Sequence, residues 1–319
     1  MPADSNTHKL PSSALRRFAW GFLAYSIAVI LWGTIVRATG SGAGCGDHWP
    51  LCNGTVMQQS PTMETLIEFF HRITSGISLI GVLLLLVWTW RTTEHGHLAR
   101  RSAVASFLLM LVEAILGALL VKLGLTAQSQ SPLRAPFLAM HLTNTLLLIA
   151  ALALTAHLLS RKKGFLRREV DLVAPVTTLC GVALFMVVGV SGSLAALGDT
   201  LFPPASISSA MHQDFSDASN WLVRWRWTHP SVAILASIFL LWMLARALQH
   251  GNRGKIWNNR PLTLFIFGLL LAEYMLGTLN VVLLAPVWMQ VVHLLAADVL
   301  WVALVVLTAR LTLMPRTLN

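Results

Sequence analysis

Eight apolar segments follow one another along the chain, separated by polar stretches. They cover residues 18–36, 66–90, 103–121, 137–159, 172–190, 228–247, 262–285 and 287–309. The hydrocarbon layer of a bilayer is about 30 Å thick, which takes about 20 helical residues to cross. A helix satisfies its own backbone hydrogen bonds in lipid, and these runs are too long for barrel strands. The pattern predicts an all-α integral membrane protein with eight transmembrane helices.

The connections between these segments alternate in charge. Residues 1–17, 91–102, 160–170, 246–261 and 310–319 hold 17 of the 23 Lys and Arg residues. Positively charged loops stay on the cytoplasmic side, so we expect both termini there. The net charge of +10 then reflects orientation in a lipid bilayer and gives no indication of a nucleic-acid partner. The short polar N-terminal segment favours a bacterial cytoplasmic (inner) membrane.

The two halves of the chain resemble one another. Residues 40–47 recur as residues 192–199 with five of eight positions identical, and the same shift of 152 residues relates His141 to His293. Because each half has four helices, both halves keep the same orientation. We therefore predict two tandem, parallel-repeat four-helix bundles. The expected boundaries are a cytoplasmic N-terminal segment 1–17, a first bundle 18–159, a cytoplasmic linker 160–171, a second bundle 172–310 and a tail 311–319.

Four of the 11 histidines lie near the outward start of an even-numbered helix, two in each half. They are His71, His141, His229 and His293. A proline marks each of these helix starts, where its missing amide proton costs little. The prolines are Pro61, Pro136, Pro230 and Pro286.

Imidazoles from facing helices of a bundle can supply the two axial bonds of a haem iron. The expected pairs are His71 with His141 and His229 with His293. A zinc site fits less well, because each half offers only two histidines where zinc takes four ligands. The remaining alternative is that the histidines are hydrogen-bonded structural residues.

The two halves differ around the first histidine of each pair. Glu68 lies one helical turn before His71, whereas Arg226 lies at the corresponding place before His229. A carboxylate beside a haem can accept a proton, orient a water or stabilise positive charge. Glu68 is therefore the candidate catalytic residue, with an ion pair to Arg72 as the structural alternative. The asymmetry indicates one reaction site and one structural or electron-transfer site.

Other polar groups on the outer side complete the candidate site. Cys45 and Cys52 lie seven residues apart in the first outer loop, where they can form a disulfide or, less favourably, a redox pair. Haem propionates need cations, and Arg37, Arg72 and Arg226 are the candidates. Deeper in the membrane, Glu113 and Glu273 recur in a Glu-x-x-x-Gly pattern, which favours a shared structural role at least as much as catalysis.

These features together resemble the haem A synthase family over residues 18–310. The resemblance rests on Glu68-Phe-Phe-His71-Arg72, the cysteine spacing in the Gly-rich loop, the eight-helix duplication and the series His141, His229 and His293. It implies oxidation of the C8 methyl group of haem O to a formyl group, through a hydroxylated intermediate, to give haem A for terminal cytochrome oxidase. It further implies substrate haem at the first pair and a haem b at the second.

The same resemblance implies partners and one departure. Haem O synthase and cytochrome oxidase assembly factors are the expected protein partners, and a homo-oligomer is an open alternative. Some family members carry a second cysteine pair in the third outer loop, whereas residues 191–227 contain no cysteine.

Two other functions compete with this interpretation. A diheme membrane cytochrome that passes electrons from quinol would explain the four histidines but not the presence of Glu68 in one half only. A duplicated transporter with Glu113 and Glu273 as proton relays would explain the repeat but not the paired histidines.

Overall fold

A computed structural model describes residues 11–55, 60–161, 165–167, 173–250 and 259–315. Eight of its helices are long and apolar enough to cross a membrane, as predicted. They are α1 (Ser13–Ala38), α2 (Met63–Thr92), α3 (Leu98–Lys122), α4 (Arg134–Leu159), α5 (Val173–Leu201), α8 (Thr228–His250), α9 (Arg260–Val282) and α10 (Val287–Thr312). The protein is thus an all-helical, multi-pass membrane protein, as the apolar pattern indicates.

Short elements connect the long helices at the two ends of the molecule. The 3-10 helix η1 (Ser41–Ala43) follows α1, and the helices α6 (Ile207–Phe215) and α7 (Trp221–Arg224) lie between α5 and α8. At the opposite end, β1 (Phe165–Arg167) pairs antiparallel with β2 (Leu313–Pro315). This small sheet is an addition to the predicted all-α fold. Within the predicted N-terminal segment, linker and C-terminal tail, residues 1–10, 162–164, 168–171 and 316–319 lie outside the described residues.

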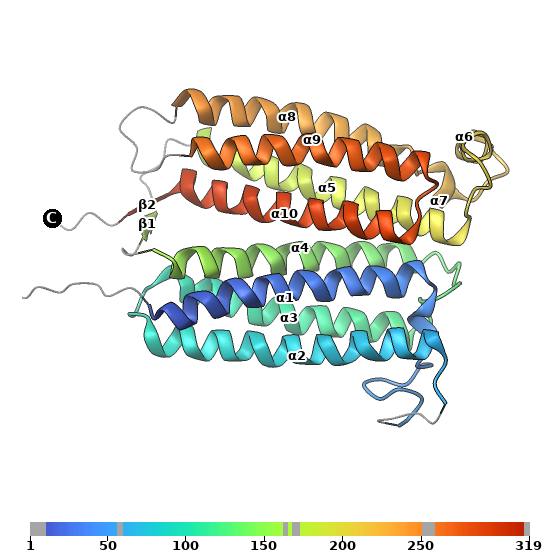
Figure 1. The fold of residues 1–319 in the computed structure, drawn as a ribbon, viewed down its shortest axis with the longest axis horizontal. Helices are drawn as coiled ribbons and strands as arrows, with labels where there is room; N and C mark the ends of the chain where they lie inside the picture. The colour runs from blue at the N-terminus through green and yellow to red at the C-terminus, as the bar shows by residue number, and fades with distance from the viewer. Residues whose placement is uncertain (1–10, 56–59, 162–164, 168–172, 251–258, 316–319) are drawn as a thin grey trace, which may run out of the picture.

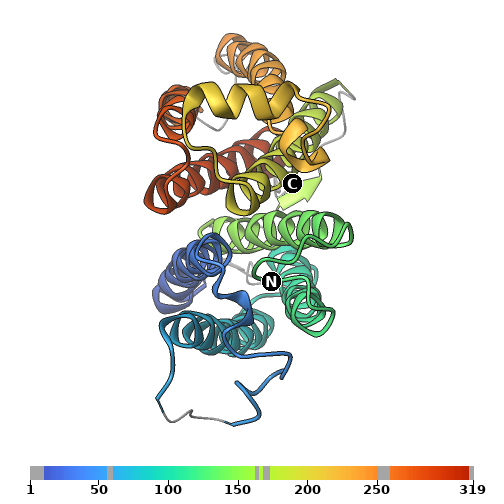
Figure 2. The ribbon, with the colours of Figure 1, turned by 90° about the vertical axis from the view of Figure 1, so that its right-hand side faces the viewer.

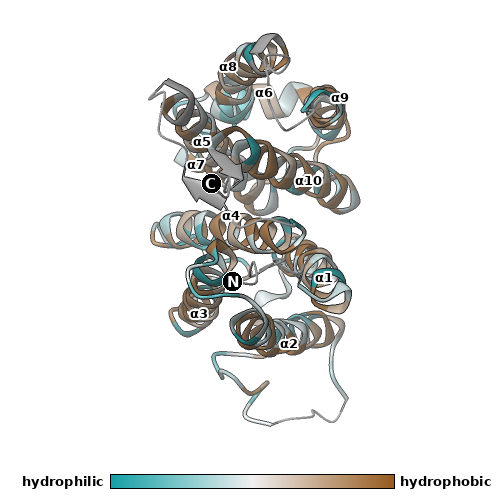
Figure 3. Cartoon of the chain, turned by 90° about the vertical axis from the view of Figure 1, so that its left-hand side faces the viewer, coloured by the Kyte–Doolittle hydropathy of each residue, from teal (hydrophilic) through white to brown (hydrophobic). Residues whose placement is uncertain are grey.

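The long helices run side by side in two groups of four (Figure 1). Helices α1–α4 form one group and α5, α8, α9 and α10 the other, and end-on views show the same division (Figures 2 and 3). Within each group every helix packs against two neighbours, so α2 faces α4 across the first group and α8 faces α10 across the second. Helices α4 and α10 pack against each other between the groups. The predicted domain boundaries and the duplication stay predictions.

One apolar core runs through both groups. Trp301 of α10 is fully buried; its indole N–H donates to the Leu146 carbonyl of α4 at 2.8 Å, and its ring stacks on Phe185 of α5 at 4.9 Å. Arg37 of α1 links the groups near the end where η1, α6 and α7 lie, and it donates there to the Ala196 carbonyl, the Thr200 hydroxyl and the Gln290 side chain. Apolar packing and buried hydrogen bonds therefore join the two groups along their length.

The expectation that the fifth helix ends at residue 190 is wrong. Helix α5 continues to Leu201, so residues 192–199 are helical, whereas the matching residues 40–47 form η1 and turns. The sequence match thus pairs segments of different structure. The helix continues because its late polar side chains are satisfied within the protein. Thr200 accepts from Arg37, and Asp199 accepts from Arg226 at 2.9 Å.

The contact of Trp301 between the groups yields a stability prediction. Trp301→Ala should lower the free energy of unfolding by about 3–5 kcal/mol, because it opens a cavity and removes the buried hydrogen bond that the indole donates to the Leu146 carbonyl. Thermal unfolding of the purified protein in mild detergent measures this effect. Trp288→Ala on the same helix, where the side chain is 58% exposed, is the matched control and should change little. Equal shifts for both variants would contradict the assigned role of Trp301.

Candidate functional site

The four predicted histidines lie toward one end of the two helix groups, on helices that face each other diagonally. His71 and His141 come from α2 and α4, and His229 and His293 from α8 and α10. The rings of His229 and His293 are 6.5 Å apart between centroids, with an angle of 70° between their planes. His71 and His141 are close enough to interact electrostatically. The structure therefore brings together the same two pairs that the sequence predicts.

Each histidine ring packs against a glycine on a neighbouring helix. A Cβ atom added at Gly33 of α1 would lie 3.0 Å from Cε1 of His71, and one at Gly192 of α5 would lie 2.9 Å from Cε1 of His229. Added Cβ atoms at Gly117 of α3 and Gly277 of α9 would lie 3.6 Å from His141 and 3.4 Å from His293, which is ordinary contact or nearly so. Real Cβ atoms essentially never show a contact as short as the one at Gly192, and the contact at Gly33 is tighter than nearly all real ones, so glycine makes room for the imidazoles there.

Two glutamates that the sequence left without a definite role lie beside the second histidine of each pair. Glu113 Oε1 is 2.9 Å from Nδ1 of His141, and Glu273 Oε2 is 3.2 Å from Nδ1 of His293, the second contact being less well aligned. A carboxylate at Nδ1 fixes the ring orientation and directs Nε2 toward a metal. The repeated Glu-x-x-x-Gly pattern in the sequence was the feature from which this contact could have been predicted. It places Glu113 and Gly117, like Glu273 and Gly277, one turn apart on the same helix face.

Neither of the first histidines of the two pairs has a carboxylate at Nδ1. His229 Nδ1 lies 3.2 Å from the Ser191 hydroxyl, and His71 Nδ1 is buried without a hydrogen-bond partner in the described part of the chain. The two histidines of each pair are therefore held differently, one by a carboxylate and the other mainly by packing.

Glu68 is buried at 3% exposure and anchors the loop between α1 and α2 that contains Cys45 and Cys52. Its Oε2 accepts from the backbone amide of Cys45 at 2.8 Å, and its Oε1 accepts from Arg72 at 2.6 Å. Arg72 also donates to the carbonyls of His48 and Leu51, at 2.5 and 2.6 Å. Glu68 and Arg72 thus form the ion pair that the sequence offered as the structural alternative, and this pair holds the loop over the N-terminal end of α2.

The cysteines of this loop form the predicted disulfide between Cys45 and Cys52. The loop lies directly on the α2 backbone at Gly44, where an added Cβ atom would be 2.4 Å from the Glu64 carbonyl carbon. The Thr65 hydroxyl donates to the Gly44 carbonyl at 2.8 Å. A side chain at residue 44 would push the loop off the helix and break the bond from Cys45 to Glu68. Close backbone packing and the disulfide therefore fix the position of the Glu68 carboxylate.

The three arginines proposed for propionates donate to protein groups in this structure. Arg37 joins the two helix groups and Arg72 holds the outer loop. Arg226 is buried at 8% exposure and donates to Asp199 and Asp214 at 2.9 and 2.8 Å. Their contacts show structural roles, and propionate binding by them stays a prediction.

The separation of the rings in the second histidine pair fits a haem iron held between them. Two metal–nitrogen bonds of about 2 Å, plus about 1 Å from each nitrogen to its ring centroid, give about 6 Å, close to the 6.5 Å between His229 and His293. No group of three or more His, Cys, Asp and Glu residues that could hold a metal ion occurs among the described residues. Two imidazoles per site suit a porphyrin, which supplies the remaining four nitrogens, better than a zinc ion.

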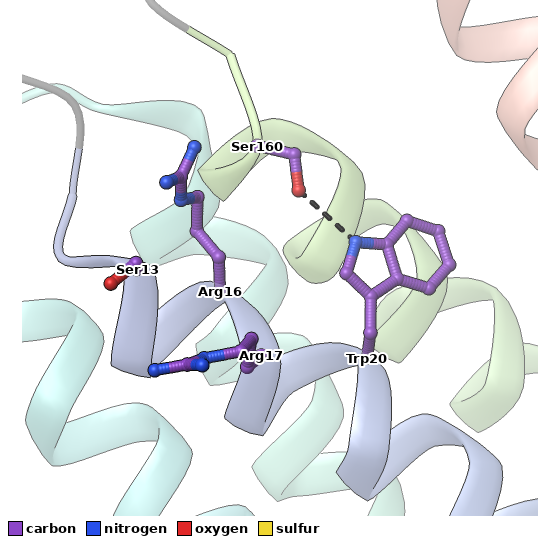
Figure 4. Close-up of a pocket in the computed structure, with 5 residues that line it drawn as sticks. All are labelled: Ser13, Arg16, Arg17, Trp20 and Ser160. Carbon is purple, nitrogen blue, oxygen red and sulfur yellow. Dashed lines mark hydrogen bonds between the residues drawn. The ribbon is translucent and has the colours of Figure 1, made fainter.

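A separate cleft of about 520 Å³ lies at the opposite end of the helices. It is lined by Ser13, Arg16, Arg17, Trp20 and Ser160, and the Trp20 indole donates to the Ser160 hydroxyl at 3.1 Å (Figure 4). Ser160 caps the end of α4, whereas His141 lies near its start. This cleft is therefore no part of the histidine site.

Fold and site together define a polytopic membrane protein with two pairs of facing histidines. The chain belongs to the COX15-CtaA family of cytochrome oxidase assembly proteins, whose model matches residues 16–305. It is 28% identical to the Heme A synthases of Bacillus cereus and Bacillus anthracis over 288 residues, covering 87% of both chains. It is 40% identical over 296 residues to a Thermus thermophilus protein named protoheme IX farnesyltransferase, covering 92% of this chain but only 48% of that relative. The chain thus spans about half the length of the Thermus protein.

The glycines at the histidines yield a test of the site geometry. Gly33→Ala and Gly192→Ala should each displace one imidazole and lower the affinity for added haem by roughly 10-fold, measured from the low-spin absorption spectrum of the purified protein. Gly21→Ala and Gly268→Ala are matched controls in α1 and α9, because an added Cβ atom meets nothing within 4 Å there. Loss of binding in the controls, or full binding in the test variants, would rule out this geometry.

Proposed function

We propose that the protein is a haem A synthase. In this proposal it oxidises the C8 methyl group of haem O to a formyl group, through a hydroxylated intermediate, and so provides haem A for terminal cytochrome oxidase. The observation that carries the proposal is the presence of two similar histidine pairs, of which only one has a buried, rigidly held carboxylate one turn away. Similarity to Heme A synthases over 87% of both chains supports the same assignment.

The comparisons favour oxidation over farnesyl transfer. The Thermus protein named a farnesyltransferase is about twice as long as the region it shares with this chain, so its name need not describe that region. The Heme A synthases have the same extent as this chain and match it along almost all of their length. The region shared with the Thermus protein also matches the cytochrome oxidase assembly family.

In the proposed arrangement haem O binds between His71 and His141, next to Glu68. The Cys45 amide and Arg72 hold the Glu68 carboxylate in place, so that it need not reorganise when positive charge develops on the substrate. Haem b binds between His229 and His293 and supplies one-electron redox chemistry. Glu113 and Glu273 orient His141 and His293 through their Nδ1 atoms. This contact accounts for the repeated glutamates without a transporter function.

The proposed membrane location, orientation and partners follow from the same function. We place the protein in the bacterial cytoplasmic membrane with both termini in the cytoplasm, and the histidine pairs toward the outer face. Trp49, Trp221, Trp225 and Trp288 lie near that end and are 43–58% exposed, as expected for side chains at a membrane–water interface. Haem O synthase and oxidase assembly factors are the proposed partners.

Analysis of bound haem tests the reaction. Protein expressed with a supply of haem O should release haem A or its hydroxylated precursor together with haem b on acid-acetone extraction, resolved by chromatography and mass. Glu68→Gln should keep both haems but lose conversion, because the amide still accepts from Cys45 yet carries no charge. Glu64→Gln, one turn earlier on α2 and exposed, is the matched control. Haem b alone in the wild-type protein would instead support a diheme electron carrier, and normal conversion by Glu68→Gln would exclude its proposed role.

The second pair is tested by removing its histidines one at a time. His229→Ala and His293→Ala should each deplete haem b and leave the first site occupied, because each removes one of two axial ligands. Pyridine haemochrome spectra and extraction measure the content of each haem. His212→Ala, in α6 outside the site, should leave both haems unchanged. Wild-type spectra in both test variants would refute the pairing.

A further inference from the structure

The two glutamates that contact histidines differ in their other hydrogen bonds. Asn144 donates its amide to Glu113 Oε2 at 2.6 Å, and the Thr145 hydroxyl lies within hydrogen-bond distance of both Glu113 Oε1 and the His141 carbonyl, so its one proton is shared between these two acceptors. Both donors belong to α4, three and four residues after His141. Glu113 therefore shares its two oxygens among the His141 ring and two further donors.

The second half has no such donors at the corresponding positions. Three and four residues after His293 stand Ala296 and Ala297, whose side chains cannot donate. Glu273 Oε1 is buried without a hydrogen-bond partner in the described part of the chain, as is Nδ1 of His293 apart from its 3.2 Å contact with Glu273. Asp298 of α10, buried at 2% exposure, is close enough to Glu273 to interact with it electrostatically, but no side chain in the described part of the chain donates a hydrogen bond to Glu273 Oε1.

Hydrogen bonds to a carboxylate change how strongly it polarises a histidine. A carboxylate at Nδ1 raises the basicity of the ring, so Nε2 becomes a stronger donor to iron and stabilises the oxidised metal. Additional donors draw charge from the same carboxylate and weaken this effect. The same axial ligand can thus give different reduction potentials, depending on the residues that contact its glutamate.

We propose that Glu113 and Glu273 are positioning residues that set the electron donation of His141 and His293, and that Asn144 and Thr145 weaken it in the first half only. This inference rests on the proposed function in one respect, namely that the histidines hold haem. It assigns the difference in electron donation between His141 and His293 to residues that are not themselves haem ligands. The first-half haem then has a higher reduction potential than it would have without Asn144 and Thr145.

Exchanging the donors between the halves tests the proposal. Asn144→Ala combined with Thr145→Ala should lower the potential of the first-half haem, whereas Ala296→Asn combined with Ala297→Thr should raise that of the second. Glu113→Gln and Glu273→Gln should each raise the potential of their own haem. The measurement is an optical potentiometric titration, with electron paramagnetic resonance of the oxidised irons, on full-length protein loaded with haem b as the probe. His71→Ala and His229→Ala identify which component belongs to which half.

Opposite shifts in the two exchange variants are the result expected, because packing changes alone would not produce a sign that follows the donors. Thr143→Ala is the matched control on the same turn of α4. Its side chain lines a groove on the surface between α3 and α4, together with Val112 and Leu116. Shifts of equal sign in both exchanges, or unchanged potentials with both haems bound, would overturn this inference alone. A wild-type protein that binds no haem would instead overturn the proposed function. Ala297→Thr by itself, with its smaller added volume, provides the same test if the double variant fails to fold.

Discussion

An imidazole inside an apolar helix bundle needs both space for its ring and a partner for its second nitrogen, and much of this structure meets that requirement. A polar group buried without a partner costs free energy, so the neighbouring helices must supply what lipid cannot. Helices α3 and α9 supply both, because Glu113 with Gly117 and Glu273 with Gly277 face the two histidines from one helix surface each. This requirement explains why the glutamates and the glycines recur together.

The outer loop shows how a charged residue at the membrane boundary is stabilised. Glu68 and Arg72 neutralise one another, and their remaining hydrogen-bonding capacity is used by the backbone of the disulfide loop. Buried ion pairs gain little stability by themselves and commonly serve to fix a geometry. Here the ion pair fixes the position of the Glu68 carboxylate, one helical turn from His71. The disulfide-closed loop lies at the same end of the helices. The structural and the proposed catalytic roles of Glu68 are therefore compatible.

Several parts of the site followed from sequence because they depend on local spacing or on strong composition. The eight apolar runs determined the helices, since a chain in lipid has few other ways to pair its backbone. Prolines located the helix starts, and the cysteine spacing led to the disulfide that the structure contains. The four histidines could be paired because they lie at similar depth on even-numbered helices. The helices and the disulfide depend on residues close together in the chain, whereas the histidine pairing depends on the similarity between the two halves.

What only the tertiary structure decided depends on contacts between distant segments. The match of residues 40–47 with 192–199 was misleading, because Arg37 and Arg226 satisfy polar side chains in α5 and allow that helix to continue. In the sequence no partner for these two arginines can be recognised, because the groups that accept their hydrogen bonds lie on other helices and loops. Glu113 and Glu273 were visible as a repeat, but their contacts with His141 and His293 required the packing of α3 on α4 and of α9 on α10. The sequence by itself determined which segments are long and apolar enough to cross a membrane and which residues are candidates for the chemistry, whereas hydrogen bonds between helices decided which partners those residues have.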